Sequence, residues 1–332
     1  MPAKKPRETA EPVGLKEVIE FFSDEEKCFE YAVRYRWPNG DIACPRCGSM
    51  TVYFVKSVKR WKCAEEHPQR QFSVKVGTLM EDSPLPLSKW FACMWLLGNC
   101  KNGVSSYEIA RDLDVTQKSA WFMLQRIRLA MGEHETLDPM TGEVEADETF
   151  IGGLARNMHK HKRAEKITSR GASGKAIVFG LLSRKTKKVR VKHVTDRQRV
   201  TLHSEIKANV APGSSLYTDD WFPYRQLEGF EHDFVNHAEQ YVNGAVHTNG
   251  MENFWSLLKR AIKGTYVSVE PFHLFRYLDE QAFRYNERKN EEGDFGRFET
   301  IAKNIGGKRL TYKHLIAQDA PKVEAPTAPA PH

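Results

Sequence analysis

The sequence has no apolar stretch long enough to cross a membrane. Its most apolar run, from Trp90 to Leu97, is far shorter than the roughly 20 residues that a membrane-spanning helix needs. The first residues, MPAKKPRE, are basic, but the apolar stretch that a secretory signal requires does not follow them. The sequence therefore argues against a membrane protein and a secreted protein, and we expect a soluble protein of the cytoplasm.

Cysteine is also scarce. The chain has 6 cysteines in 332 residues, too few for a disulfide scaffold, and this favours a reducing compartment. Cys93 and Cys100 lie in the apolar run FACMWLLGNC, where we expect small buried hydrophobic side chains. Three of the others are clustered: Cys44, Cys47 and Cys63.

The chain has no excess of negative charge; positive charges outnumber negative ones. The formal net charge is +7 and the sequence pI is about 9.0, with lysine and arginine gathered in runs. Such runs favour a polyanionic partner, and nucleic acid is the first candidate. The length suffices for about two domains. Residues 1–13 and the Ala/Pro-rich residues 318–332 have little to bury and are predicted to be disordered tails.

The clustered cysteines have the spacing of a zinc site. Cys44 and Cys47 form a CxxC pair, and Cys63 is followed four residues later by His67. Tetrahedral zinc accepts three thiolates and one imidazole, and residues 51–63 alternate as the hairpin of a zinc ribbon would. We therefore predict structural Zn²⁺ on these four residues. Two alternatives stay open: His67 in a solvated loop, and a redox CxxC pair.

A helix-turn-helix segment is predicted after the ribbon. Ser105 and Glu108 have the spacing of a capping box, and Thr116 is placed to cap a second helix, QKSAWFMLQRIRLAM. An ordinary helical hairpin with a solvated polar face is the alternative. If the segment binds DNA, the first turn of the second helix would contact base edges through Gln117, Lys118 and Ser119.

Residues 141–290 alternate between strand-like and helix-like patterns, which is typical of an α/β domain. GEVEADETFIGG, KAIVFGLLSR and VRVKHVTD indicate three strands in series, and SSLYTDDW indicates a fourth that ends in Asp219 and Asp220. Thr195 and Asp196 are expected to cap the intervening helix. The segment HTNGMENFWSLLKRAIKG predicts a later helix that leaves Glu252 on its polar face, opposite an apolar stripe of Met251, Phe254, Leu258 and Ile262.

Three carboxylates of this region are the candidate catalytic residues: Asp147, Asp219 and Glu252. A carboxylate in a central strand is costly unless a cation compensates its charge, and Asp147 lies among apolar residues. Two carboxylates at adjacent strand ends and one on a following helix can hold two Mg²⁺ ions about 3.5–4 Å apart for phosphodiester chemistry. Structural alternatives remain: a satisfied core carboxylate for Asp147, Asp220 in place of Asp219, and a capping box with Asn249 for Glu252.

Basic side chains near these acids are candidate phosphate contacts. Residues 156–175 carry seven Lys or Arg against one Glu, and residues 184–188 form the turn RKTKK. A solvated loop is the alternative for both stretches. Aromatic residues near the acids, which could stack on an unpaired base or pack in the core, are Trp221, Tyr224 and Trp255. The cations predicted to bind DNA are Lys160, Lys162, Arg163 and Lys259.

Several motifs together resemble one known family. CPRCGS, FSVKVGTLMEDS, the helix-turn-helix, EADETFIGG, YTDDWFPY, VHTNGMENFWSLLKRAIKGTY and FHLFRYLDEQAFRYNER are similar to insertion-sequence transposases of the acid-triad (DDE) superfamily. The resemblance is to the ISXO-type branch, which has an N-terminal zinc ribbon, and it covers about residues 20–290.

This resemblance implies a fold and an activity. It implies a ribonuclease H-like domain, a mixed sheet with flanking helices, with Asp147, Asp219 and Glu252 as first, second and third acid. It also implies Mg²⁺ or Mn²⁺ at that site, hydrolysis at the element's terminal repeats, and joining of the freed 3′-hydroxyl to target DNA. Such enzymes act on DNA as homo-oligomers that pair two ends.

The sequence thus predicts five segments with one preferred function. They are a tail (1–13), a zinc ribbon (14–83), a helix-turn-helix segment (84–135), a ribonuclease H-like domain (141–290) and a second tail (318–332). A DNA transposase is the preferred function. The alternatives are a non-enzymatic DNA-binding regulator derived from a transposase, and a related nuclease that cuts without joining.

Overall fold

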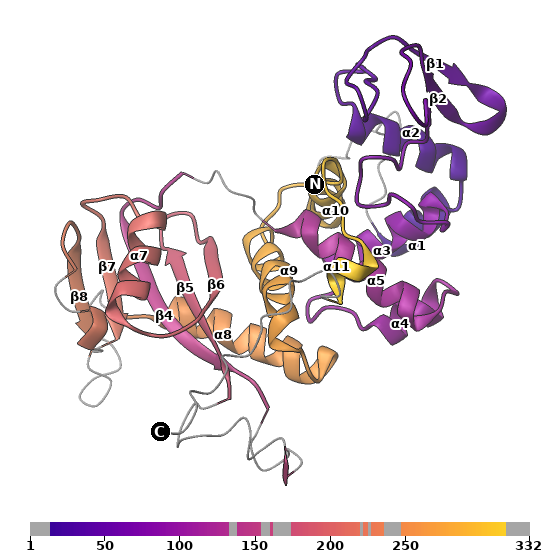
Figure 1. The fold of residues 1–332 in the computed structure, drawn as a ribbon. Coiled ribbons are helices and arrows are strands. Elements are labelled where there is room, and N and C mark those ends of the chain that lie inside the picture. Colours follow the sequence, from indigo (N-terminus) through magenta and orange to yellow (C-terminus); the bar gives the residue numbers. More distant parts are fainter. Residues whose placement is uncertain are drawn as a thin grey trace, which may run out of the picture.

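The computed structural model describes residues 14–132, 138–153, 160–161, 174–219, 222–224, 227–235 and 247–316. It contains a small antiparallel sheet, a group of helices and a five-stranded mixed sheet (Figure 1). Both predicted tails lie outside the described residues, and so does most of the basic stretch 156–175.

The N-terminal part is a three-stranded sheet packed on two helices. Residues of the inner face of this sheet, Trp61 and Phe72, stack with ring centroids 5.9 Å apart, and Trp37 after the second helix packs edge-on against Trp61. The predicted hairpin is confirmed, whereas neither helix was assigned from the sequence. The elements are α1 (Leu15–Phe22), α2 (Glu25–Arg36), β1 (Val52–Val55), η1 (Lys56–Val58), β2 (Arg60–Cys63) and β3 (Gln71–Phe72).

The helical part contains both helices that were predicted around the tight turn. Ser105 and Glu108 form the expected capping box, and the Thr116 side chain accepts a hydrogen bond from the Ser119 N–H. Both start signals are therefore confirmed. The helices of this part are α3 (Leu87–Asn99), α4 (Ser106–Asp112), α5 (Gln117–Met131), α10 (Gly293–Lys303) and α11 (Tyr312–Leu315).

The mixed sheet has the strand order β6-β5-β4-β7-β8. The central strand β4 pairs antiparallel with β5 and parallel with β7, and β8 extends the parallel side. All four predicted strands form, but β8 was missed because its sequence EHDFV is mostly polar and it lies at the edge. The strands are β4 (Glu143–Ile151), β5 (Ala176–Ser183), β6 (Val189–Val194), β7 (Ser215–Asp219) and β8 (Glu231–Val235).

Alternation along β4 sends its side chains to two separate cores. Val144 and Ala146 pack with Leu202 of α7 on one face, while Ile151 packs with Met251 of α8 on the other. Figure 1 shows α8 reaching the sheet and α9 between the sheet and the N-terminal helices. The remaining elements are α7 (Arg199–Asn209), η3 (Phe222–Tyr224), α8 (Asn249–Ala261), the π-helical turn η4 (Ile262–Tyr266), η5 (Pro271–His273) and α9 (Leu274–Asn286).

One predicted helix start differs from the structure. The intervening helix α7 begins at Arg199 after Gln198, and not at Thr195 or Asp196. The Asp196 carboxylate instead accepts hydrogen bonds from the Gln198 N–H and from the Thr201 hydroxyl, so it stabilises the turn before the helix. The prediction that Thr195 or Asp196 caps this helix is therefore wrong, because its N-cap is Gln198 and no side chain caps it.

A buried ion cluster joins the sheet to the N-terminal helices. Arg128 of α5 donates to Glu280 of α9 at 2.6 Å, and Arg284 and the Tyr266 hydroxyl donate to the same carboxylate. Both partners of the first pair are almost fully buried. Removing one partner of such a pair leaves an uncompensated buried charge, so this junction depends on both halves of the chain.

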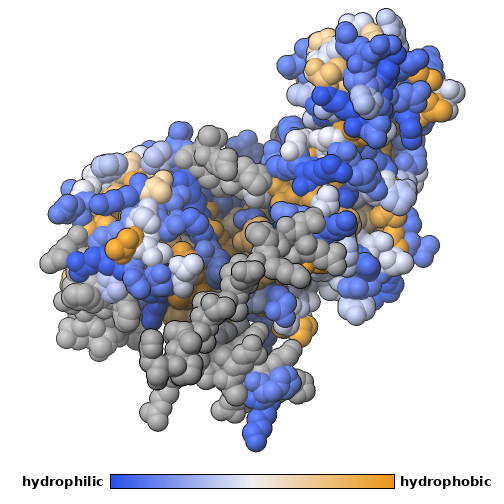
Figure 2. All heavy atoms as spheres, in the orientation of Figure 1, coloured by the Kyte–Doolittle hydropathy of each residue, from blue (hydrophilic) through white to orange (hydrophobic). Residues whose placement is uncertain are grey.

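The surface of the described residues is mostly hydrophilic in the view of Figure 2. Among these residues, no helix is long and apolar enough to cross a membrane.

Candidate active site and zinc centre

Asp147 and Asp219 lie on neighbouring strands and on the same face of the mixed sheet. The parallel register pairs Glu145 of β4 with Tyr217 of β7, and each aspartate is two residues further along its strand. Because side chains alternate along a strand, a step of two keeps each aspartate on the face of its predecessor. The structure therefore brings together the first two predicted acids.

Asp147 is a half-buried carboxylate in a negative environment. The Trp255 indole N–H donates to one of its oxygens at 2.9 Å, and the Glu148 backbone N–H donates to the other at 2.7 Å. Burial, followed by the charges of Asp219 and Glu148, raises the pKa of Asp147 to about 7. A nearby cation would stabilise the ionised Asp147 carboxylate, because it would offset the repulsion and replace the lost hydration.

The next acid along β4, Glu148, points toward the opposite core. The Tyr224 hydroxyl donates to one of its oxygens, and the other oxygen is buried without a hydrogen-bond partner among the described residues. Burial raises the pKa of Glu148. Tyr224 is fully buried, so of the two roles considered for it the structure supports packing in the core and not stacking on a DNA base. Trp255 is also buried, and Trp221 lies outside the described residues.

The first turns of α8 contact both aspartates. The Thr248 hydroxyl donates to Asp219 at 3.1 Å, and Trp255 binds Asp147. Residues at positions i, i+4 and i+7 share one face of a helix, so Glu252 lies on the face of Thr248 and Trp255. The Glu252 side chain is exposed. A divalent cation held by the two aspartates would thus find a third carboxylate on the same face.

The alternative role of Glu252 in a capping box does not fit the structure. The N-cap of α8 is Thr248, so Asn249 is the first helical residue and not the cap, and no side-chain capping bond forms. A capping box needs the acid at the third helical position, which Met251 occupies.

Gly180 of β5 lets α8 approach the acids closely. Gly180 is the register partner of Asp147. A Cβ at this position would lie 2.3 Å from Met251 Cε and 2.7 Å from the Trp255 ring. The indole can therefore cross β5 and reach Asp147 only because position 180 has no side chain. The sequence did not point to this residue, because a glycine in a strand does not indicate which side chain packs on it.

A second carboxylate of β4 anchors the start of α8. Glu145 is 2% exposed and pairs with Arg184 at 2.9 Å, while its other oxygen accepts the Met251 N–H at 3.0 Å. Arg184 also donates to the His247 carbonyl at 2.6 Å and lies over the Tyr217 ring. The prediction that the turn 184–188 presents its cations to solvent or to DNA is therefore wrong for Arg184. This guanidinium is bound inside the fold.

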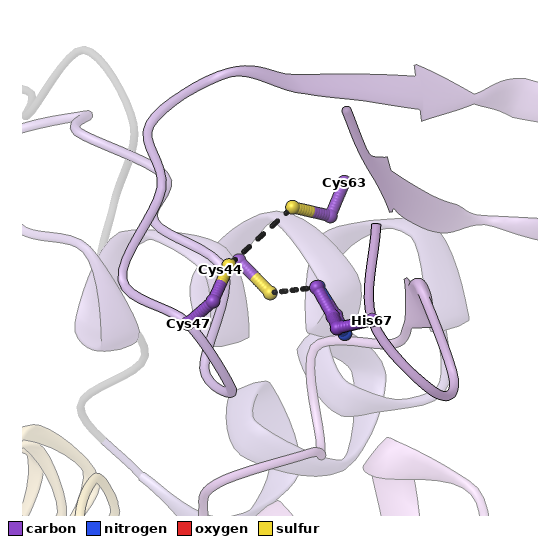
Figure 3. Close-up of side chains that lie close together, drawn as sticks. All are labelled: Cys44, Cys47, Cys63 and His67. Carbon is purple, nitrogen blue, oxygen red and sulfur yellow. Dashed lines mark hydrogen bonds between the residues drawn. The ribbon is translucent and has the colours of Figure 1, made fainter. Parts of the chain in front are cut away.

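The four predicted zinc ligands converge at the end of the ribbon (Figure 3). Their ligand atoms all lie within 4.8 Å of one another. Cys44 Sγ is 3.5 Å from His67 Nε2, and Cys47 Sγ is 3.6 Å from Cys63 Sγ. Three thiolates and one imidazole in this arrangement form a closed structural zinc site, so the residues present fit the metal.

Neighbouring groups prepare two of these ligands. His67 Nδ1 lies 2.9 Å from the Pro68 carbonyl, which leaves Nε2 directed at the cysteines. Burial opposes ionisation of Cys44, but the backbone N–H groups of Arg46 and Cys47 outweigh it and lower the pKa of this thiol to about 7. The thiolate is the form that zinc binds.

The predicted DNA-contacting residues are dispersed over the molecule. Gln117 is exposed and donates to the Ser106 hydroxyl, Lys118 lies over the Tyr312 ring at 4.5 Å, and Ser119 closes the Thr116 cap. Lys160 and Lys259 are exposed. Lys162 and Arg163 lie outside the described residues.

Comparisons with known proteins agree with this geometry. Residues 139–286 match the model of an ISXO2-like transposase domain, and residues 23–65 match a transposase zinc-ribbon domain. The chain is 28% identical over 259 residues to an uncharacterized protein in transposable element ISH50 of Halobacterium salinarum, covering 73% of this chain and 84% of that protein. It is 32% identical over 95 residues to an uncharacterized transposase-like protein of Haemophilus influenzae, covering 28% of this chain and 76% of that protein.

Proposed function

Since this chain belongs to the DDE-superfamily insertion-sequence transposases, in the ISXO2-like branch with an N-terminal zinc ribbon, we propose that it is a DNA transposase. In this proposal it binds the ends of its element, cleaves phosphodiester bonds there with Mg²⁺ or Mn²⁺, and joins the ends to target DNA. The observation that carries the proposal is the pairing of Asp147 with Asp219 beneath the first turns of α8.

The proposed catalytic fold is ribonuclease H-like. The support is the mixed five-stranded sheet, in which three antiparallel strands in series are followed by two parallel strands on the other side of β4. Helices cover both faces. In this topology the acids of β4 and β7 lie on neighbouring strands, which supports the proposal, and the third acid is assigned to a later helix.

We assign the metal to Asp147, Asp219 and Glu252. When bound there, divalent metal would supply charge stabilisation for the attacking and leaving oxygens of a phosphoryl displacement. Trp255 fixes the rotamer of Asp147, and Thr248 fixes that of Asp219, so neither carboxylate has to reorient when the site is loaded. The unpaired oxygen of Glu148 adds negative potential that favours a cation.

DNA binding is assigned to several elements. The first turn of α5, with Gln117, Lys118 and Ser119, is proposed as the recognition element of a helix-turn-helix. Lys160, Lys162, Arg163 and Lys259 are proposed contacts to the phosphate backbone. Zinc on the four ribbon ligands is structural, and pairing of two element ends implies a homo-oligomer.

The test is a strand-transfer assay with labelled duplexes that carry the DNA ends flanking the protein's own gene. Wild type with Mg²⁺ is expected to give cleaved and joined products. Asp147→Asn, Asp219→Asn and Glu252→Gln should lose cleavage by several orders of magnitude and keep duplex binding, because they remove metal ligands. Glu270→Gln, which changes an exposed acid outside the site, is the matched control.

Each outcome assigns a function. Cleavage without joining would identify a nuclease that cuts only, and duplex binding without cleavage by wild type would identify a DNA-binding regulator. Wild-type cleavage by Glu252→Gln would remove that residue from the metal site.

A further inference from the structure

The two faces of the small ribbon sheet differ sharply in character. Trp61 of β2 and Phe72 of β3 are buried on the inner face. Arg60 and Lys62 alternate with Trp61 along β2, so they stand on the outer face and are exposed. The register places Gln71 of β3 directly opposite Lys62.

This outer face borders an open groove of about 630 Å³ beside the zinc ligand His67. Four cationic side chains line the groove, and no carboxylate does. Its polar and charged lining residues are Arg46, Arg60, Lys62, His67, Gln69, Arg70, Gln71 and Ser73.

One cation of the groove is fixed by hydrogen bonds to the backbone, and the other three form no ion pair among the described residues. Arg70 donates to the backbone carbonyls of Cys63 and Ala64, which fixes its guanidinium. Among the described residues, no ion pair includes Arg46, Arg60 or Lys62. Lys59, one residue before β2, is by contrast paired with Glu26 of α2.

Three exposed cations held near one another repel each other. A polyanion that spans them would remove this repulsion and stabilise them. The closed zinc site and the aromatic inner face keep the groove rigid, so little ordering entropy is lost on binding. The amides of Gln69 and Gln71 add hydrogen-bond donors for phosphate oxygens.

We propose that this groove binds the phosphate backbone of duplex DNA, as a contact separate from the helix-turn-helix and from the catalytic face. The inference rests on the proposed function for the identity of the polyanion. In it, zinc maintains the shape of a DNA-binding surface, and Arg46, Arg60, Lys62 and Arg70 supply its charge.

The test is the salt dependence of duplex binding by the full-length, zinc-loaded chain. Arg60→Gln/Lys62→Gln is compared with wild type and with Lys16→Gln/Lys313→Gln, a control that removes two exposed charges outside the groove. The slope of log K against log salt is negative, and each lost phosphate contact makes it shallower by about 0.9. We expect a slope about 1.8 units shallower for the groove variant and a wild-type slope for the control. Retention of one zinc per chain and of the circular dichroism spectrum verifies folding.

The outcomes separate this proposal from the proposed function. A groove variant with the wild-type salt slope would overturn the groove assignment, and wild-type strand transfer would in that case still stand. Duplex binding that weakens in the groove variant, with no cleavage by wild type, supports the groove while the proposed function fails. If single-stranded RNA competes better than duplex DNA, and the groove variant abolishes that preference, the groove binds RNA and the proposal is wrong.

Discussion

Two acids of β4 face α8, the buried Glu145 and the half-buried Asp147, and their electrostatic surroundings are opposite. Glu145 is neutralised by Arg184 and accepts a backbone N–H, so its charge serves the fold. Asp147, two residues later on the same face, receives two N–H groups but also the repulsion of Asp219 and Glu148. One strand thus carries a carboxylate that is already compensated and another that a cation would compensate.

The raised pKa of Asp147 predicts a pH-dependent affinity for metal. Because that pKa is about 7, the group carries a proton below this pH, and a metal ion must displace it. We expect the affinity for Mn²⁺ or Mg²⁺ to fall roughly tenfold per pH unit below 7 and to level off above pH 8. Calorimetric titration at pH 6, 7 and 8 measures this. Equal affinity at all three would contradict it.

The sign of the effect on stability follows from the same shift. The folded pKa of about 7 lies above the ordinary value of 3.8, so without metal the folded state binds the proton more tightly than the unfolded state. This contribution to stability is fully present below pH about 4 and is lost as the pH rises through 7. Asp147→Asn should therefore stabilise the metal-free protein at pH 8 and have little effect at pH 4, as measured by urea unfolding.

The pair formed by Arg184 and Glu145 should be needed for both stability and cleavage. Arg184→Met removes the guanidinium that neutralises the buried Glu145 carboxylate, and removing one partner of a buried pair typically costs about 3–5 kcal/mol. The change also frees the His247 carbonyl, so α8 should lose its position over the acids. Urea unfolding and the cleavage rate measure the two effects.

The controls for this pair are matched in place and in chemistry. Lys185→Met removes an exposed cation from the same turn and should have no effect. Glu145→Gln/Arg184→Met should cost less than the sum of the two single changes, because no unpaired charge remains. Additive costs would show that the two side chains act separately.

At the level of elements, the zinc ribbon and the mixed sheet have separate apolar cores. The ribbon residues Trp61 and Phe72 belong to the core of the N-terminal helices, whereas the strands of the mixed sheet divide their side chains between two other cores. The ribbon sheet is small and depends on its ligands for closure. The element that unites the candidate site is α8, whose first turns contact both aspartates and which carries Glu252, the proposed third acid.

Removal of zinc should unfold the ribbon and spare the sheet. Small zinc ribbons depend on the metal for folding, because few apolar residues are available to them. With a chelator, hydrogen exchange is expected to rise in residues 40–75 and to stay low in β4, β5 and α8. Cys63→Ser should reproduce the result without a chelator, and Cys100→Ser, outside the ligand set, is the control. Loss of protection in β4 would contradict the separation.

On the scale of the whole molecule, the chain leaves the mixed sheet through α9 and returns to the N-terminal helices. Phe298 of α10 is fully buried, and its ring centroid lies 5.0 Å from that of Phe22 in α1 and 5.7 Å from that of Phe91 in α3. The N-terminal part is therefore completed by residues beyond position 290, where the sequence analysis ended its last domain.

This closure predicts the effect of truncation. A chain that ends at residue 290 lacks α10 and should expose the core around Phe91, so it should aggregate or melt at a clearly lower temperature. Phe298→Ala should cost about 3–5 kcal/mol by leaving a cavity. A chain that ends at residue 316 retains every described element and is the control. Equal melting temperatures for the chains ending at 290 and 316 would contradict the packing.

The sequence by itself determined the local chemistry of this protein. Ligand spacing predicted the zinc site, because a closed tetrahedral site leaves few arrangements open, and periodicity located β4, β5, β6, β7 and α8. Capping residues located α4 and α5. These are short-range properties, in which residues a few positions apart determine each other's geometry.

Only the tertiary structure decided what surrounds the acids. It placed Asp147 beside Asp219 and packed the Trp255 ring against Gly180, where there is no side chain. It also bound Arg184 inside the fold. It also brought α10 back to the N-terminal core. These contacts join residues far apart in the chain, and a local pattern cannot show which side chain will neutralise, cover or exclude another.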